Sequence, residues 1–152
     1  MTWKFACGVL VLVAICAVVE PSASAAPSDA CSLLTPEQIS GVLGAAVGPG
    51  ERLVASSPKM CGFGGAGNAK RVVVALLTLD MFTHEKTPLQ GISEESVSGL
   101  GDDAHFMTTP GFGTGLSIKK GSFAFKVRVY GFPPDQIKEK EKTLAQQVLA
   151  KL

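Results

Sequence analysis

The chain carries near its middle the stretch Val97-Ser98-Gly99-Leu100-Gly101-Asp102-Asp103-Ala104-His105-Phe106, in which chain-reversing residues lead directly into apolar–polar alternation. Glycine and aspartate favour tight turns, because glycine readily adopts positive φ and aspartate can bond nearby backbone. The alternation that follows is typical of a strand with Ala104 and Phe106 on one face. We therefore interpret this stretch as a structural turn that joins two halves, each with strands and a helix, and that is formed by Gly99, Gly101, Asp102 and Asp103. Leu100 is expected to fill the core.

Before this turn the sequence predicts two helices and three strands. The first helix has a Thr35 cap, Pro36 at its first position and Gln38 to close a capping box, and Gly44 is expected to end it. Strands are predicted for residues 53–55, 60–63 and 71–79, with a loop at 56–58. The third strand is so rich in valine and leucine that we expect it to be central and covered by helix on at least one side. A short helix within residues 80–90 would pack Met81 and Phe82 inward.

After the turn the pattern predicts a second set of strands and a closing helix. We expect a strand at 104–108, a loop at 109–115 and a tight hairpin turn at Lys120-Gly121. Residues 123–130 show the clearest period-two alternation in the chain. A helix starting at 133–135 carries an apolar stripe that ends at Leu152, while the mixed charges of 138–142 indicate a solvated face. The fold class predicted is a single α+β domain with an antiparallel β-sheet flanked by an N-terminal and a C-terminal helix.

The first 25 residues resemble an export signal. Lys4 precedes an uncharged apolar run at 5–19, and Ala23-Ser24-Ala25 gives a small-x-small cleavage pattern. The run is shorter than the roughly 18 to 20 residues that a membrane-spanning helix needs. We expect residues 1–25 to be removed as a signal peptide, which leaves residues 26–152 as one domain. The protein would then be secreted or periplasmic in the cell envelope, with no stable membrane insertion and no lipid anchor.

Removal of the signal would leave two cysteines, Cys31 and Cys61. Cysteine pairs in exported proteins usually form a disulfide. The alternative is a metal-binding or catalytic thiol, but neither cysteine has a second cysteine or a histidine at ligand spacing. We therefore predict one structural disulfide between Cys31 and Cys61.

The charges favour no polyanionic partner. The chain has 14 basic and 13 acidic residues and a net charge of +1, without a block of like charge. Nucleic acids and anionic membranes are bound through clustered positive charge. The sequence therefore predicts an envelope or extracellular protein, or a small ligand, as the partner, and no nucleic acid.

Catalytic and cofactor motifs are weak. Residues 62–67 match Gly-x-Gly-x-x-Gly literally, but a valine-rich strand follows instead of the helix that a nucleotide site requires. No Gly-x-Ser-x-Gly elbow is present. Asp102, Asp103 and His105 could be imagined as zinc or calcium ligands, yet Asp102 lies in the turn and a zinc site needs three or four converging ligands. His84 has no companion ligand at helical spacing. We assign no catalytic residue, no metal and no cofactor.

Two glycine-rich loops are the candidate binding surfaces. Each offers an aromatic side chain on flexible backbone, and such loops often carry recognition. Phenylalanines buried beneath loops are an equally common arrangement. The candidate binding residues are Phe63, Gly64 and Gly65 in the first loop and Phe112 and Gly113 in the second.

Several motifs, taken in order, resemble one family. They are Cys31-Ser32-Leu33-Leu34-Thr35-Pro36-Glu37, Gly44, Cys61-Gly62-Phe63, Gly99-Leu100-Gly101-Asp102-Asp103-Ala104 and the closing amphipathic helix. This order is similar to a family of small exported bacterial proteins, many of them lipid-anchored, that are grouped as a domain of unknown function. The resemblance implies a PsbP-like α+β architecture and a disulfide that joins the segment before the first helix to a strand. Phe63 stands where the family commonly has an indole, and the lipobox is missing.

These observations favour an exported, non-catalytic binding or accessory module of the bacterial cell envelope. One alternative is a secreted inhibitor of a protease or other hydrolase, since a small domain with protruding loops could occupy an enzyme cleft. Another is a small metal-dependent or hydrolytic enzyme built around Asp102, Asp103 and His105.

Overall fold

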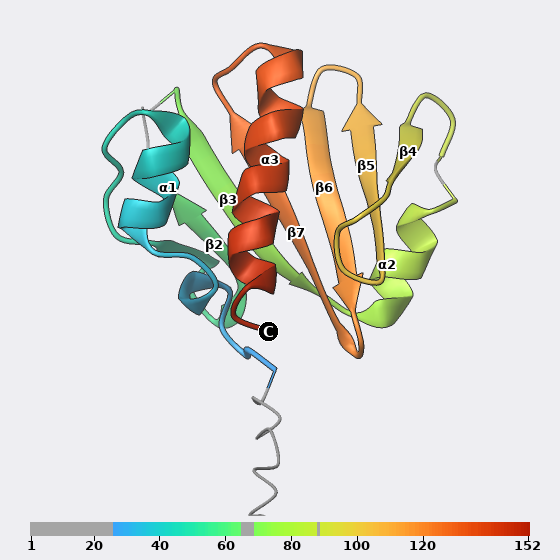
Figure 1. Cartoon of the computed structure of the whole chain (residues 1–152), viewed down its shortest axis with the longest axis horizontal. Coiled ribbons are helices and arrows are strands. Elements are labelled where there is room, and N and C mark those ends of the chain that lie inside the picture. The colour runs from blue at the N-terminus through green and yellow to red at the C-terminus, as the bar shows by residue number, and fades with distance from the viewer. Residues whose placement is uncertain (1–25, 65–68, 88) are drawn as a thin grey trace, which may run out of the picture.

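A seven-stranded antiparallel sheet forms the centre of the molecule, with the strand order β1-β2-β3-β7-β6-β5-β4 (Figure 1). The computed structural model describes residues 26–64, 69–87 and 89–152. The strands are β1 (Glu51–Val54), β2 (Ser57–Phe63), β3 (Arg71–Leu77), β4 (Ser93–Val97), β5 (Asp103–Thr109), β6 (Gly113–Lys120) and β7 (Phe123–Tyr130). The helices are the 3-10 helix η1 (Ala30–Ser32), α1 (Pro36–Leu43), α2 (Leu79–Glu85) and α3 (Pro134–Leu149). The predicted α+β class is confirmed.

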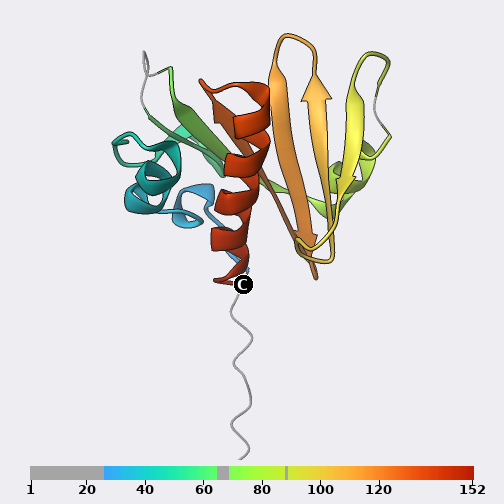
Figure 2. The same ribbon diagram turned by 45° about the horizontal axis from the view of Figure 1, so that its top comes forward.

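The helices lie on both faces of this sheet. α1 and α3 cover one face, where α3 runs across β6 and β7 (Figure 2). α2 packs on the opposite face, against β6 and parts of β3 and β7. The main core fills the space between the sheet and the helices α1 and α3. Its largest side chains are Phe63, Phe106, Phe125, Leu34, Ile39, Leu116, Ile118 and Leu144. No helix within the described ranges has both the length and the apolar character needed to cross a membrane.

The chain path differs from the predicted one at the central turn. After β3 the chain passes through α2 to the far edge of the sheet, starts again at β4, and returns strand by strand until β7 pairs with β3 (Figure 1). That ladder extends from Arg71 opposite Tyr130 to Leu77 opposite Ala124. Residues 98–102 connect only the neighbouring strands β4 and β5. The prediction that this turn joins the two halves is therefore wrong, because β4 was missed among the polar residues 93–97.

The turn instead fixes the β4–β5 hairpin against the β6–β7 hairpin. Gly99 and Gly101 have φ values of 81° and 61°, and Leu100 between them is 5% exposed. The Asp102 amide donates to the carbonyl oxygen of Lys119 at 2.8 Å, and its carboxylate accepts from the Gly121 amide at 2.6 Å. The bond from Gly121 also lowers the pKa of Asp102. The Asp102 carboxylate thus bonds the next turn of the sheet and not its own.

Local signals explain most element boundaries. Thr35 and Gln38 form the predicted capping box of α1, and Gly44 ends the helix with φ of 65°. Thr78 caps α2 and accepts from the Met81 amide, so β3 ends at Leu77 and Leu79 belongs to the helix. Two predicted loops are shorter than expected, because residues 57–58 belong to β2 and residues 113–115 belong to β6. In both places pairing with a neighbouring strand outweighs the local preference of proline and glycine for loops.

Three side chains differ from the prediction in whether they are buried or exposed to solvent. Met81 is 51% exposed while Phe82 is buried, so α2 has a single inward aromatic. Leu152 lies beyond α3 and is 40% exposed. Glu141, expected on the solvated face of α3, is fully buried. Its Oε1 accepts a hydrogen bond of 2.9 Å from the Val129 amide of β7, whose strand pairs with β6 only as far as Val127. Glu141 thereby satisfies a backbone donor that the sheet leaves unpaired.

The predicted disulfide is confirmed. Cys31 in η1 and Cys61 in β2 are joined, with their Cα atoms 5.0 Å apart. Cys61 is completely buried in the main core. The bridge therefore attaches the segment before α1 to the sheet.

Removal of the disulfide is expected to lower the free energy of unfolding by about 3 kcal/mol, because the bond restricts a loop of about 30 residues in the unfolded chain. Urea denaturation of the wild type with and without a thiol reductant measures this difference. A Cys31→Ser/Cys61→Ser double variant is the control, since the reductant should leave its denaturation midpoint unchanged. Equal midpoints for the oxidised and reduced wild type would contradict the prediction.

Candidate functional site

A groove of about 420 Å³ lies on the sheet face opposite α1 and α3, over β1, β2, β3 and β7. α2 covers the same face only farther along, near β6. The groove is lined by Glu51, Leu53, Met60, Gly62, Phe63, Arg71, Val72, Val73, Arg128 and Tyr130. Sites for small ligands typically have such volumes, an apolar lining and a few polar groups that converge. This groove is therefore the candidate binding site.

Strand register places four of the groove residues in one row. Glu51, Gly62, Val73 and Arg128 stand opposite one another in a single row across the four strands. Gly62 has no side chain, and a Cβ atom there would lie 2.7 Å from Leu53 Cδ2. Leu53 therefore leans over β2 in the space that the glycine leaves.

The wall of the groove near the β1 edge is apolar. Leu53 is 52% exposed and Met60 is 39% exposed. The two residues stand on adjacent antiparallel strands, and Leu53 reaches across to Gly62. Exposed side chains of this size that gather beside a hollow are typical of binding surfaces.

The wall formed by β3 and β7 is cationic and aromatic. The Arg71 guanidinium lies 4.6 Å from the centre of the Tyr130 ring and the Arg128 guanidinium lies 5.7 Å from it, so both cations are close to the ring. Neither arginine forms an ion pair with a carboxylate of the described residues. The acidic residue of the lining is Glu51, at the opposite end of the row.

Arg128 connects this wall to the turn between β5 and β6. It donates to the carbonyl oxygens of Phe112 at 3.3 Å and Thr114 at 3.4 Å. Its side chain crosses Gly115 of β6, where a Cβ atom would lie 2.8 Å from Arg128 Cγ. A glycine on β6 therefore lets the arginine reach the turn.

The two predicted binding loops have different outcomes. Phe63 lies in the strand predicted for residues 60–63, but it is 2% exposed in the main core, so the prediction that it is a binding residue is wrong. Its place in β2 directs the ring toward the helices, where it crowds Gly50. Gly64 ends β2 with φ of 113°, and Gly65 lies outside the described residues. Phe112 is 73% exposed in the turn before Gly113, the first residue of β6.

Substitution of the two phenylalanines should therefore have opposite outcomes. Phe63→Ala leaves a cavity in the main core and is expected to lower the free energy of unfolding by about 3 kcal/mol. Phe112→Ala removes an exposed ring and should change it by less than about 0.5 kcal/mol. Thermal or urea denaturation of the two variants measures the contrast. Similar losses of stability in both would show that the ring of Phe112 is packed.

Asp102, Asp103 and His105, the three possible metal ligands in the sequence, have separate partners. Asp102 bonds Gly121, and Asp103 forms an ion pair of 2.5 Å with Lys86 of the segment after α2. His105 is fully buried, with its ring 4.8 Å from that of Phe82. Across residues 26–64, 69–87 and 89–152, no three histidine, cysteine or acidic side chains are placed to hold a metal ion. The structure therefore does not bring these three side chains together as metal ligands.

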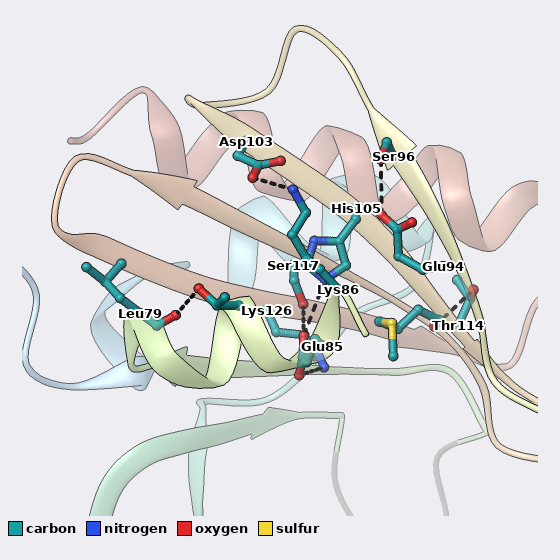
Figure 3. A network of polar contacts seen from close by, with 12 residues as sticks. Leu79, Glu85, Lys86, Glu94, Ser96, Asp103, His105, Thr114, Ser117 and Lys126 are labelled. Atoms are coloured by element: carbon teal, nitrogen blue, oxygen red, sulfur yellow. Dashed lines mark hydrogen bonds and ion pairs between the residues drawn. The ribbon is translucent and has the colours of Figure 1, made fainter. Parts of the chain in front are cut away.

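A partly buried polar network joins α2 to the sheet (Figure 3). Glu85 of α2 accepts a hydrogen bond of 2.6 Å from Ser117 Oγ and a short one from Lys126 Nζ. His105 Nε2 lies 3.7 Å from the same carboxylate. Burial of Glu85 opposes its ionisation, but the contacts with His105, Lys126 and Ser117 outweigh burial and lower its pKa to about 2.

The network contains serine, histidine and an acid, but not in the arrangement of a hydrolase. In a catalytic triad the serine hydroxyl donates to the histidine and is open to substrate. Here Ser117 is completely buried and donates to Glu85 instead. The geometry supports a structural role, in which the carboxylate holds α2 on β5, β6 and β7.

Comparison of the chain with protein-family models, with curated proteins and with solved structures finds no match. The resemblance to the exported domain-of-unknown-function family therefore stays a prediction.

The strands of the groove are predictable from the sequence, but the groove itself is not. Arg128 and Tyr130 occupy the outward positions of the alternation in β7, which the pattern assigned to solvent. Arg71 begins the adjacent strand β3. A period-two pattern shows which residues share a face of one strand but not which strands are neighbours, so it could not place Arg71 beside Tyr130.

Proposed function

We propose that the protein is an exported, non-catalytic binding or accessory module of the bacterial cell envelope and that the groove is its binding surface. The observation that carries the proposal is a groove that has Tyr130 with two arginines close to its ring and, near the β1 edge, the apolar side chains of Leu53 and Met60. Apolar side chains and convergent polar groups in one concavity are the usual features of a ligand site. A sheet face used only as a solvated surface would gain little from this combination.

Two further observations support export. Residues 1–25 have the charge, apolar run and cleavage pattern of a signal peptide, although they lie outside the described residues. The Cys31–Cys61 disulfide suits an oxidising compartment outside the cytoplasm.

The proposal can be tested by nuclear magnetic resonance. Fractions of an envelope extract are added to the isotope-labelled protein, and amide shifts are mapped on the structure. We expect at least one fraction to shift amides of β2, β3 and β7 around Gly62, Val73 and Tyr130. The Arg71→Gln/Arg128→Gln variant should lose these shifts. No shift in any fraction, or shifts confined to α1 and α3, would overturn the proposal.

The inhibitor alternative has one observation in its favour. Phe112 is 73% exposed at the end of the β5–β6 hairpin, a place from which an aromatic side chain can enter an enzyme cleft. Incubation with a panel of proteases and other hydrolases tests it. Loss of inhibition in Phe112→Ala, with inhibition retained in Arg71→Gln, would favour this function over the groove.

A further inference from the structure

We infer that the groove binds a single-chain amphipathic carboxylate, with its head at the cationic wall formed by Arg71 and Arg128 and its hydrocarbon chain directed over Val73 toward Met60 and Leu53. This inference rests on the proposed function and names the class of ligand that the groove takes. It follows from the division of the groove into a cationic wall and an apolar wall.

The cationic wall suits one anionic head. Two guanidinium groups lie close to the Tyr130 ring, and neither is neutralised by a carboxylate within residues 26–64, 69–87 and 89–152. Arginine presents several donors in one plane and matches a carboxylate in a bidentate way. Because Arg128 is already held by the carbonyl oxygens of Phe112 and Thr114, less side-chain freedom is lost when an anion binds.

The apolar wall suits hydrocarbon. β2 and β3 are interior strands of the sheet, and their backbone groups pair with neighbouring strands on both sides. A peptide laid over Val73, Met60 and Leu53 would bury its own amides without partners, and each unpaired amide is costly. An alkyl chain brings no such groups. The distance from β7 to β1 is three strand spacings, or roughly 14 Å, so an extended chain can span the floor.

Glu51 limits which end of the ligand can carry a negative charge. It stands on β1 at the end of the row that has Arg128 at the other end. A second anionic group at the β1 edge would meet its carboxylate. The charges therefore favour a ligand with one head near β7 and an uncharged tail, and they disfavour a dicarboxylate of similar length.

Isothermal titration calorimetry of the purified, oxidised protein tests the inference. The ligands are decanoate and decyltrimethylammonium, both below their critical micelle concentrations, and acetate. Decanoate should bind, while the cation with the same chain and the head alone should not. Arg71→Gln and Arg128→Gln should each weaken decanoate binding by about tenfold, because a charge-assisted hydrogen bond is lost. Met60→Gln should also weaken it. Lys59→Gln removes an exposed charge next to Met60 in β2 and should leave binding unchanged.

Other results would overturn the inference. Equal binding of decanoate and decyltrimethylammonium would mean that the arginines do not select the head. Binding of phosphatidylglycerol vesicles without binding of decanoate would identify an electrostatic membrane surface instead. If decanoate fails while an envelope fraction still shifts groove amides, the proposed function stands and the ligand class is wrong. If both fail, the groove is not a binding surface.

Discussion

Replacement of Gly101 by valine is expected to lower the free energy of unfolding by about 4 kcal/mol or more, which is a large fraction of the total stability of a typical domain. Gly101 has φ of 61°, which a β-branched residue strongly disfavours. A Cβ atom there would also lie in hard contact with the carbonyl oxygen of Lys119 and 2.9 Å from Ile118 Cγ2. β6 cannot move away, because it is paired with β5 and β7 on either side.

Gly99 provides the matched control for this prediction. It also has positive φ, of 81°, but a Cβ atom there meets nothing within 4 Å. Gly99→Ala should therefore cost only backbone strain of about 1 kcal/mol, whereas Gly101→Ala should cost markedly more. Urea denaturation of the two alanine variants separates strain from close contact. Equal losses at the two positions would show that contact with β6 contributes nothing.

Glu141 is expected to make the protein less stable as the pH rises. Burial of its carboxyl group raises the pKa to about 8, and the hydrogen bond from the Val129 amide offsets only part of this effect. In the unfolded chain the group titrates near its ordinary value of 4.5. Between these values the folded state keeps a proton that the unfolded state has lost, so the free energy of unfolding falls with rising pH. The stabilisation is complete below pH 4.5 and lost by about pH 8, and the difference is on the order of 4 kcal/mol.

Glu141→Gln should remove this dependence while keeping an oxygen for the Val129 amide. The variant and the wild type should be similarly stable near pH 5, and the variant should become the more stable as the pH approaches 8. Glu139→Gln, on the exposed side of α3, is the control and should follow the wild type. A difference in stability between Glu141→Gln and wild type that does not change from pH 5 to 8 would contradict the prediction.

Glu85 affects stability at the acidic end of the pH range. Its lowered pKa stabilises the fold above pH 4.5, and this contribution is lost as the pH falls toward 2.

The elements that local chemistry determines were predictable from the sequence. The capping box at Thr35 and Gln38, the stop at Gly44 and the alternation of residues 123–130 each depend on residues close together in the chain. β4 was not predictable in this way. It has the sequence Ser-Glu-Glu-Ser-Val and lies at the edge of the sheet, so it needs no regular apolar face.

The burial of Glu141 and the shape of the groove come from contacts distant in sequence. Glu141 lies in a run of alternating charges, and only its position over the splayed end of β6 and β7 explains its burial. The groove depends in the same way on Gly62 and Val73 becoming neighbours of Arg128. Phe63 shows the converse error, because its strand was predictable, but the glycine-rich residues after it suggested a binding role while strand register places its ring in the core.

The β3–β7 ladder has a consequence for synthesis from the N-terminus. Residues 71–77 cannot complete their pairing until residues 123–130 have emerged, because after β3 the chain passes to the far edge strand β4 and reaches the neighbour of β3 only with β7. Both cysteines of the disulfide precede β3 and are present long before that point. The two cysteines can therefore form their disulfide while the edge of β3 that pairs with β7 is still unpaired. The last strand to be made is the one that closes the sheet.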